Sequence, residues 1–214
     1  MKNEKAHIDK GIRKILEKPK IFNFFNNHII GAKSYMDNYC ENHFNHLGKV
    51  DFLDIGCGTC EILESLNTEI DYYGFDMQLE YIEIARTKFS HRGQFYHEAV
   101  GQNYNTQWQS FFDVINIHGL IHHLSDEDSD ILLQAAQKYL KKTGFVITVD
   151  TVKHEGQSYA SKWLTSKDRG QNIRTPEEYL GLAEKYFNVE ESYITTDHLN
   201  IPYSIFTMKL FQKK

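Results

Sequence analysis

Two acids and two glycines are spaced in a way that suits cofactor binding. Asp54 ends a short apolar run, and Gly56 and Gly58 follow it with one residue between them. Glycine lets the backbone turn sharply and approach a ligand closely, because it carries no Cβ. Asp76 ends a second short run about twenty residues later, the spacing expected for a carboxylate that binds ribose hydroxyls. These residue types at these spacings predict a site for a nucleotide cofactor.

The residue that opens the next segment helps to distinguish between cofactor classes. A dinucleotide fingerprint has a third glycine at the sixth position of the motif, where this chain has Glu61. We expect a helix over 61–66, and a glutamate in its first turn would repel a pyrophosphate. The same glutamate is compatible with a ligand that carries an ammonium or a sulfonium. The pattern therefore favours S-adenosylmethionine over NAD.

The segment 53–59, Leu-Asp-Ile-Gly-Cys-Gly-Thr, resembles the glycine motif of class I S-adenosylmethionine-dependent methyltransferases. The resemblance implies that Asp54 and the glycine turn face the methionine part of the cofactor and that Asp76 holds the ribose. The full set of cofactor-binding residues that it implies is Asp54, Gly56, Cys57, Gly58, Asp76, Met77, Glu98, Ala99, Ile117 and His118. One departure is Cys60, because the family usually has a further glycine there.

A His-His-Leu sequence at 122–124 is a second resemblance to these enzymes. If the acceptor is a hydroxyl, its proton must be removed, and His122, His123 and His154 are candidates for the base, with Asp150 as an orienting partner. Each of these histidines taken alone is more often structural. A carboxylate or thiolate acceptor would need no strong base, and Arg169 and Arg174 could hold an anionic acceptor or simply form ion pairs.

Cys57 and Cys60 form a Cys-x-x-Cys pair, which is a redox arrangement in some proteins. In a thioredoxin-like redox site a cis-proline from a later strand faces the cysteine pair, but this chain has no proline between Pro19 and Pro176. A zinc site would need a second cysteine pair to complete the tetrahedron, and the chain has none. With Cys40, the chain has three cysteines and no even-numbered disulfide framework. We therefore expect neither a redox centre nor a metal site.

Strand and helix patterns alternate along the chain, as in a parallel sheet with helices on both faces. The predicted strands are 50–55, 70–76, 93–100, 111–117 and 145–150, followed by two closing strands, 187–194 and 205–210. The predicted helices include 79–89, one that starts after Ser125 and is stopped by 141–144, and one capped by Thr175. We predict an α/β fold with a doubly wound, mostly parallel seven-stranded sheet. The resemblance adds an antiparallel last strand and an N-terminal helical lid.

We expect one methyltransferase domain over residues 1–214. Its parts are an N-terminal helical lid (1–47), a cofactor-binding core (48–150), an acceptor-side insertion (151–174), and a last helix with the closing strands (175–214). The aromatic residues Phe22, Phe25, Tyr35 and Tyr39 either line the lid or pack in the core.

The composition limits the function classes. A net charge of −5 and a pI near 6.1 argue against a broad basic surface for nucleic acid. No apolar stretch reaches the ~18 residues of a membrane span, so we expect a cytoplasmic protein. The first hypothesis is a methyltransferase for a small-molecule acceptor, with O-methylation favoured and RNA or protein acceptors as a variant. The alternatives are a non-catalytic S-adenosylmethionine-binding protein and an NAD-dependent oxidoreductase.

Overall fold

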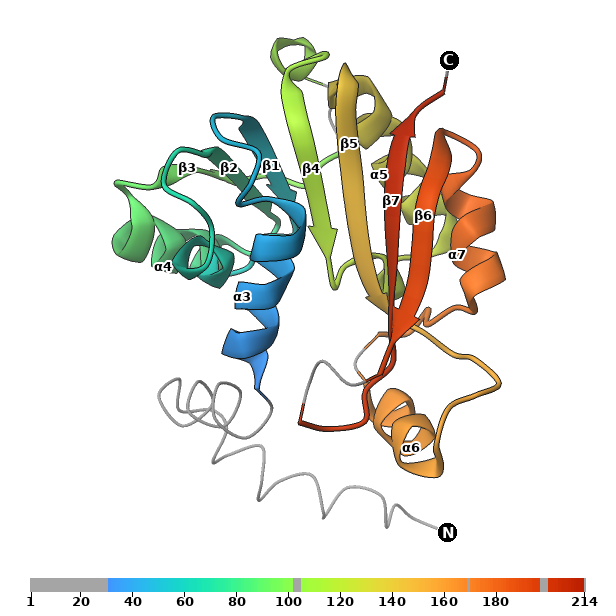
Figure 1. Ribbon diagram of the computed structural model, residues 1–214. Helices are drawn as coiled ribbons and strands as arrows, with labels where there is room; N and C mark the ends of the chain where they lie inside the picture. The colour runs from blue at the N-terminus through green and yellow to red at the C-terminus, as the bar shows by residue number, and fades with distance from the viewer. Residues whose placement is uncertain (1–30, 102–104, 169, 197–199, 214) are drawn as a thin grey trace, which may run out of the picture.

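Seven strands form one sheet in the order β3-β2-β1-β4-β5-β7-β6 (Figure 1). The computed structural model describes residues 31–101, 105–168, 170–196 and 200–213. The strands are β1 (Asp51–Ile55), β2 (Asp71–Asp76), β3 (Gly93–His97), β4 (Phe112–His118), β5 (Leu140–Thr151), β6 (Phe187–Thr195) and β7 (Ile205–Gln212). β1 to β5 pair in parallel, and β7 is antiparallel to both β5 and β6. The predicted doubly wound sheet with an antiparallel last strand is confirmed.

Helices cover both faces of this sheet (Figure 1). α3 (Ala32–His43) and α4 (Leu79–Phe89) pack on one face with a single 3₁₀ turn, η2 (Glu61–Glu64). α5 (Asp126–Tyr139) and α7 (Pro176–Ala183) pack on the other face. α6 (Tyr159–Lys167) lies beyond the carboxyl end of β5. No described helix is long and apolar enough to cross a bilayer.

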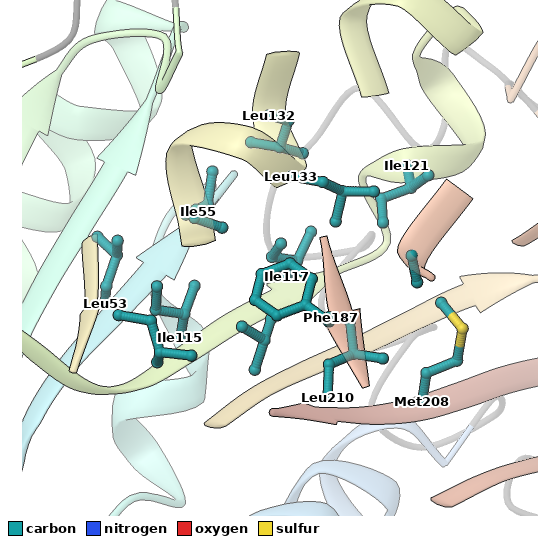
Figure 2. Close-up of a cluster of buried hydrophobic side chains, with 14 of the residues drawn as sticks. Leu53, Ile55, Ile115, Ile117, Ile121, Leu132, Leu133, Phe187, Met208 and Leu210 are labelled. Carbon is teal, nitrogen blue, oxygen red and sulfur yellow. The ribbon is translucent and has the colours of Figure 1, made fainter. Parts of the chain in front are cut away.

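The central strands contribute side chains to two hydrophobic cores, one on each face of the sheet, because successive side chains of a strand point to opposite faces. Phe52 and Val114 pack against α3 and α4, whereas Leu53 and Ile115 pack against α5. Figure 2 shows the second core, in which Leu132 of α5 lies over the aliphatic side chains of β1 and β4. Burial on both faces explains why these strands are almost continuously apolar in sequence.

Two predicted elements differ in the structure. The helix expected over 61–66 is the short 3₁₀ turn η2. Within the connection 56–70, the turn begins directly after Cys60, whose backbone is left-handed, and it ends at Glu64. The third strand, expected over 93–100, ends at His97.

The helix ends close to the predicted position, but the segment 141–144, expected to stop it, lies in a strand. α5 ends at Tyr139, and β5 begins at the next residue. Lys141 lies 2.7 Å from Asp113 and 3.0 Å from Asp51, which holds this segment against the starts of β4 and β1. A Cβ on Gly144 would lie 2.6 Å from the Asp113 carbonyl oxygen, so the glycine permits close strand packing rather than capping a helix.

The described residues include only the last part of the predicted N-terminal lid, which ends in α3. Phe22 and Phe25 lie outside the described residues, as does the rest of 1–30. Tyr39 in α3 is buried in the core against Phe44.

Candidate functional site

The turn after β1 is built from residues in left-handed backbone conformations. Gly56, Gly58 and Cys60 have φ angles of 75°, 54° and 61°. The amides of Gly56 and Cys57 both donate to the Phe75 carbonyl, at 2.8 and 3.1 Å, which fastens the turn to β2. The need for positive φ explains the two glycines, and it makes Cys60 a strained residue in a glycine position.

Asp76 lies directly beside this turn, as the sequence predicts. One of its carboxylate oxygens accepts from the Gly58 amide at 2.9 Å, and the other accepts from the Gln78 amide at 2.8 Å. Asp76 is 9% exposed and ends β2. The glycine turn and the acid therefore come together at the carboxyl edge of the sheet, where open α/β sheets bind ligands.

Asp54 is a buried acid at the end of β1. Its two oxygens accept from the Tyr72 hydroxyl at 2.6 Å and from the Asn116 side-chain amide at 2.7 Å. Burial raises the pKa of Asp54 from 3.8 to about 6, against the opposing effect of these two hydrogen bonds. Neither Asp54 nor Asp76 has a cationic partner among the described residues.

α3 is joined to the same edge by two tyrosines. The Tyr39 hydroxyl donates to the Asn116 side-chain oxygen at 2.6 Å, and the Tyr35 hydroxyl lies 3.0 Å from His118 Nε2. Burial lowers the pKa of His118 to about 4, so its ring is neutral at neutral pH. This segment therefore reaches Asp54 through Asn116.

The other predicted cofactor-binding residues are placed as follows. Met77 follows β2 and is 67% exposed, and Glu98 donates its amide to the Asp76 carbonyl at 3.0 Å. Ala99 is half-buried next to Glu98. The Ile117 side chain is fully buried in the core beneath α5, so it contributes packing.

His122 follows β4 and belongs to a buried cluster with Asp150 and Asp168. Its Nδ1 and its backbone amide lie 2.8 and 3.0 Å from the same oxygen of Asp150, at the carboxyl end of β5. Its Nε2 lies 3.6 Å from Asp168, in the segment between α6 and α7. Burial raises the pKa of Asp150, opposed by its contacts with His122. Of the three candidate histidines, His122 is the one that contacts Asp150, the suggested orienting partner.

The other two histidines lie in different surroundings. His123 is exposed, with its ring centroid 4.1 Å from that of His122. His154 Nε2 lies 3.1 Å from the Ser204 hydroxyl. His154 also lines a cavity of about 870 Å³ that reaches Ile194 on the edge strand β6. The structure thus brings His123 next to His122, whereas His154 belongs to a separate hydrogen-bond network.

Arg174 holds the His-His-Leu segment in place from outside it. Its buried guanidinium donates to the carbonyls of Ile121 and Leu124 at 3.0 and 2.8 Å, and it lies 2.7 Å from Asp126. Because its guanidinium is engaged in these contacts, Arg174 favours the ion-pair alternative over binding of an anionic acceptor. Arg169 lies outside the described residues.

Sequence reasoning missed three groups of the site. Asn116 gave a signal, because it is an amide within an otherwise apolar run. Tyr72 gave none, since a tyrosine is ordinary in a strand. Asp168 was one of many charges in the insertion, yet its carboxylate accepts from the Tyr203 hydroxyl and from the Gly170 amide. Its partner Tyr203 lies 35 residues away in sequence.

Comparisons with known proteins agree with this architecture. Residues 52–144 match a family described as "Methyltransferase domain". No curated protein sequence matches the chain. Among the described residues, no group of three or more His, Cys, Asp or Glu side chains could hold a metal ion.

Solved structures similar to this chain include several methyltransferases. The N-methyltransferase NodS from Bradyrhizobium japonicum, in complex with S-adenosyl-L-homocysteine, has a TM-score of 0.69 at 12% identity, over 95% of this chain and 97% of that one. A TehB-like S-adenosylmethionine-dependent methyltransferase from Corynebacterium glutamicum has a TM-score of 0.63 at 14% identity, over 94% and 97%. The mitomycin 7-O-methyltransferase MmcR has 0.67 at 18%, over 94% of this chain and 60% of that one. At these identities, the likeness concerns the fold.

Proposed function

We propose that this chain uses S-adenosylmethionine to methylate a small-molecule acceptor, at oxygen. Its fold is similar to that of solved methyltransferases, and residues 52–144 match the methyltransferase-domain family. The observation that carries the cofactor assignment is the pair of acids at the glycine turn. Asp54 and Asp76 are both buried and lack cationic partners among the described residues. Buried carboxylates need compensation, and a ligand with an ammonium and a sulfonium supplies it.

The residues of the turn fit such a ligand. Asp54 would face the ammonium, and Asp76 would accept from the ribose hydroxyls while Gly58 holds its second oxygen in place. Glu98 and Ala99, at the end of β3, would contact the adenine. When bound, S-adenosylmethionine supplies an activated methyl group for in-line transfer. A pyrophosphate would meet two buried acids at the same place, which disfavours NAD.

His122 is the base that the geometry supports best. Its contact with Asp150 assigns the Nδ1 proton to that hydrogen bond, which leaves Nε2 free to accept a proton from an acceptor hydroxyl. Asp150 holds the ring in place and would stabilise the positive charge that it acquires. Asp168, 3.6 Å from Nε2, borders the space from which the proton would come. His154 Nε2 instead lies 3.1 Å from the Ser204 hydroxyl, in a separate hydrogen-bond network.

Methyl transfer to a panel of hydroxyl, amine and carboxylic acid compounds tests this proposal, with S-adenosylhomocysteine formation as the readout. We expect turnover with a hydroxyl compound and binding of S-adenosylmethionine, measured by calorimetry, without binding of NAD. His122→Gln should lower kcat by about 10²-fold or more with unchanged cofactor affinity, and His123→Gln should not. Turnover of amines alone would refute O-methylation. Cofactor binding with no turnover of any compound would favour the non-catalytic alternative.

A further inference from the structure

The two thiols of the Cys-x-x-Cys pair in the glycine turn have no part in the proposed reaction, and the sequence led us to expect no redox centre here. The two sulfurs nevertheless converge on one point of the neighbouring strand. A Cβ on Gly74 of β2 would lie 3.0 Å from Cys57 Sγ and 3.2 Å from Cys60 Sγ. Glycine at this position therefore provides the space that both sulfurs occupy.

The backbone of the turn already brings the two cysteines together. The Cys60 amide donates to the Cys57 carbonyl at 2.9 Å, which closes the loop between them. Cys60 adopts a φ of 61° although glycine would adopt it without strain. Residues held in strained conformations cluster at functional sites, because the surrounding structure must compensate for the strain. The strained backbone at Cys60 therefore agrees with a functional role for this turn.

We propose that Cys57 and Cys60 form a reversible disulfide that lowers the affinity of the adjacent site for S-adenosylmethionine. This inference rests on the proposed function, since it concerns the same site. The oxidant would be a peroxide. Cys57, which is partly exposed, attacks the peroxide as a thiolate, so that the O–O bond breaks, a sulfenic acid forms and one water leaves. The thiol of Cys60, fully buried, then displaces a second water as the S–S bond forms.

The disulfide would act on the cofactor through Gly58. A disulfide fixes its sulfurs about 2.05 Å apart, so both side chains must draw together and the residues between them must shift. The Gly58 amide lies in this loop and donates to Asp76 at 2.9 Å. Moving it disturbs the carboxylate that we assign to the ribose. A hydrogen bond with Cys60, and then burial, raise the pKa of Cys57 above its ordinary value. The reactive thiolate is therefore scarce at neutral pH, and oxidation should be faster in alkaline solution.

The test compares the full-length protein after reduction with dithiothreitol and after treatment with hydrogen peroxide. Mass spectrometry of the peptide that contains residues 57 and 60 should show the loss of two hydrogens. Calorimetry with S-adenosylmethionine should show an affinity at least about tenfold lower after oxidation, and dithiothreitol should restore it. Circular dichroism should show the same secondary structure in both states.

Matched variants show whether the effect of peroxide comes from this pair or from the third cysteine, Cys40. Cys60→Ser should abolish the effect of peroxide on affinity, whereas Cys40→Ser should leave that effect intact. An unchanged affinity in wild-type protein that carries the disulfide would refute the inference, and so would failure of the disulfide to form. If the reduced protein does not bind S-adenosylmethionine at all, the proposed function itself fails.

Discussion

Asp54 shows how one buried side chain links protonation to ligand binding. It is 4% exposed, and its two hydrogen bonds do not offset the loss of hydration. Its pKa in the folded chain, about 6, lies above its ordinary value of 3.8. The folded state therefore binds this proton more tightly than the unfolded state does. The resulting contribution to stability is present below about pH 4 and is lost as the pH rises through 6.

The first prediction concerns cofactor affinity and pH. An ammonium beside Asp54 favours the ionised carboxylate, so a proton and the cofactor compete for the site. The dissociation constant of S-adenosylmethionine should rise by about tenfold per pH unit below 6 and level off above it. Calorimetry between pH 4.5 and 8 measures this profile. Asp54→Asn should bind more weakly with a flatter profile, and an unchanged profile in that variant would contradict the assignment.

The second prediction concerns Asp76. Asp76→Ala removes the acceptor assigned to the ribose and leaves the Gly58 amide without its partner. We expect it to abolish measurable binding of S-adenosylmethionine in calorimetry. Asp71→Ala is the matched control, because Asp71 begins the same strand, is exposed and lies 3.7 Å from Lys49. Full affinity in Asp76→Ala would remove the ribose assignment.

Some residues of the candidate site could be identified from sequence, and others could not. Asp54, Gly58 and Asp76 could be found because their spacing reflects a local requirement of one strand, turn and strand. Asn116 and Asp168 act through partners distant in the chain, and such contacts depend on the completed sheet. The roles of the individual site residues stay predictions until the variants are measured.

At the level of elements, local chemistry predicts the starts of helices better than their ends. Ser125 and Thr175 cap α5 and α7 as expected, and Thr175 forms a capping box with Glu178. Gly144 was misinterpreted because a glycine after two lysines is typical of a helix end. The actual reason for glycine is the approach of Asp113 from β4, a contact between segments far apart in sequence.

The third prediction concerns the segment that leads from α6 to α7. A Cβ on Gly170 would lie 2.3 Å from Cδ2 and 2.9 Å from the carbonyl oxygen of His122. Gly170→Ala should therefore displace His122 from Asp150 and lower kcat by about tenfold or more, with little change in cofactor affinity. The readouts are S-adenosylhomocysteine formation and calorimetry.

Gly181→Ala provides the matched control for that substitution. Gly181 lies within α7, and no atom is within 4 Å of the position its Cβ would take. Alanine there should raise the free energy of unfolding by about 0.5–1 kcal/mol, since it favours the helix, and should leave turnover unchanged. If Gly170→Ala behaved like Gly181→Ala, the arrangement around His122 would not matter for the reaction.

For the whole molecule, the sheet order explains why the candidate site lies where it does. From β1 the chain proceeds to β2 and β3 on one side, and β4 continues on the other side. The strand order thus reverses between β1 and β4, and their carboxyl ends mark a topological switch point, where ligands of such folds bind. Alternating strand and helix patterns made the doubly wound sheet predictable, whereas the order of its strands is known from the structure. The division of residues 1–214 into four functional parts stays a prediction, since residues 1–30 lie outside the described chain.

The fourth prediction concerns global stability. A ligand that binds only the folded chain stabilises it by about 2.7 kcal/mol at a concentration 100-fold above its dissociation constant. For a chain of 214 residues, this corresponds to a rise in Tm of roughly 5–10 °C. Thermal unfolding followed by circular dichroism should show this rise with S-adenosylmethionine and no rise with NAD. Asp76→Ala should lose the rise while Asp71→Ala retains it, because only the former alters the proposed site. A rise with NAD alone would mean that the two acids at the glycine turn do not select for a cationic ligand, and the cofactor assignment would then be wrong.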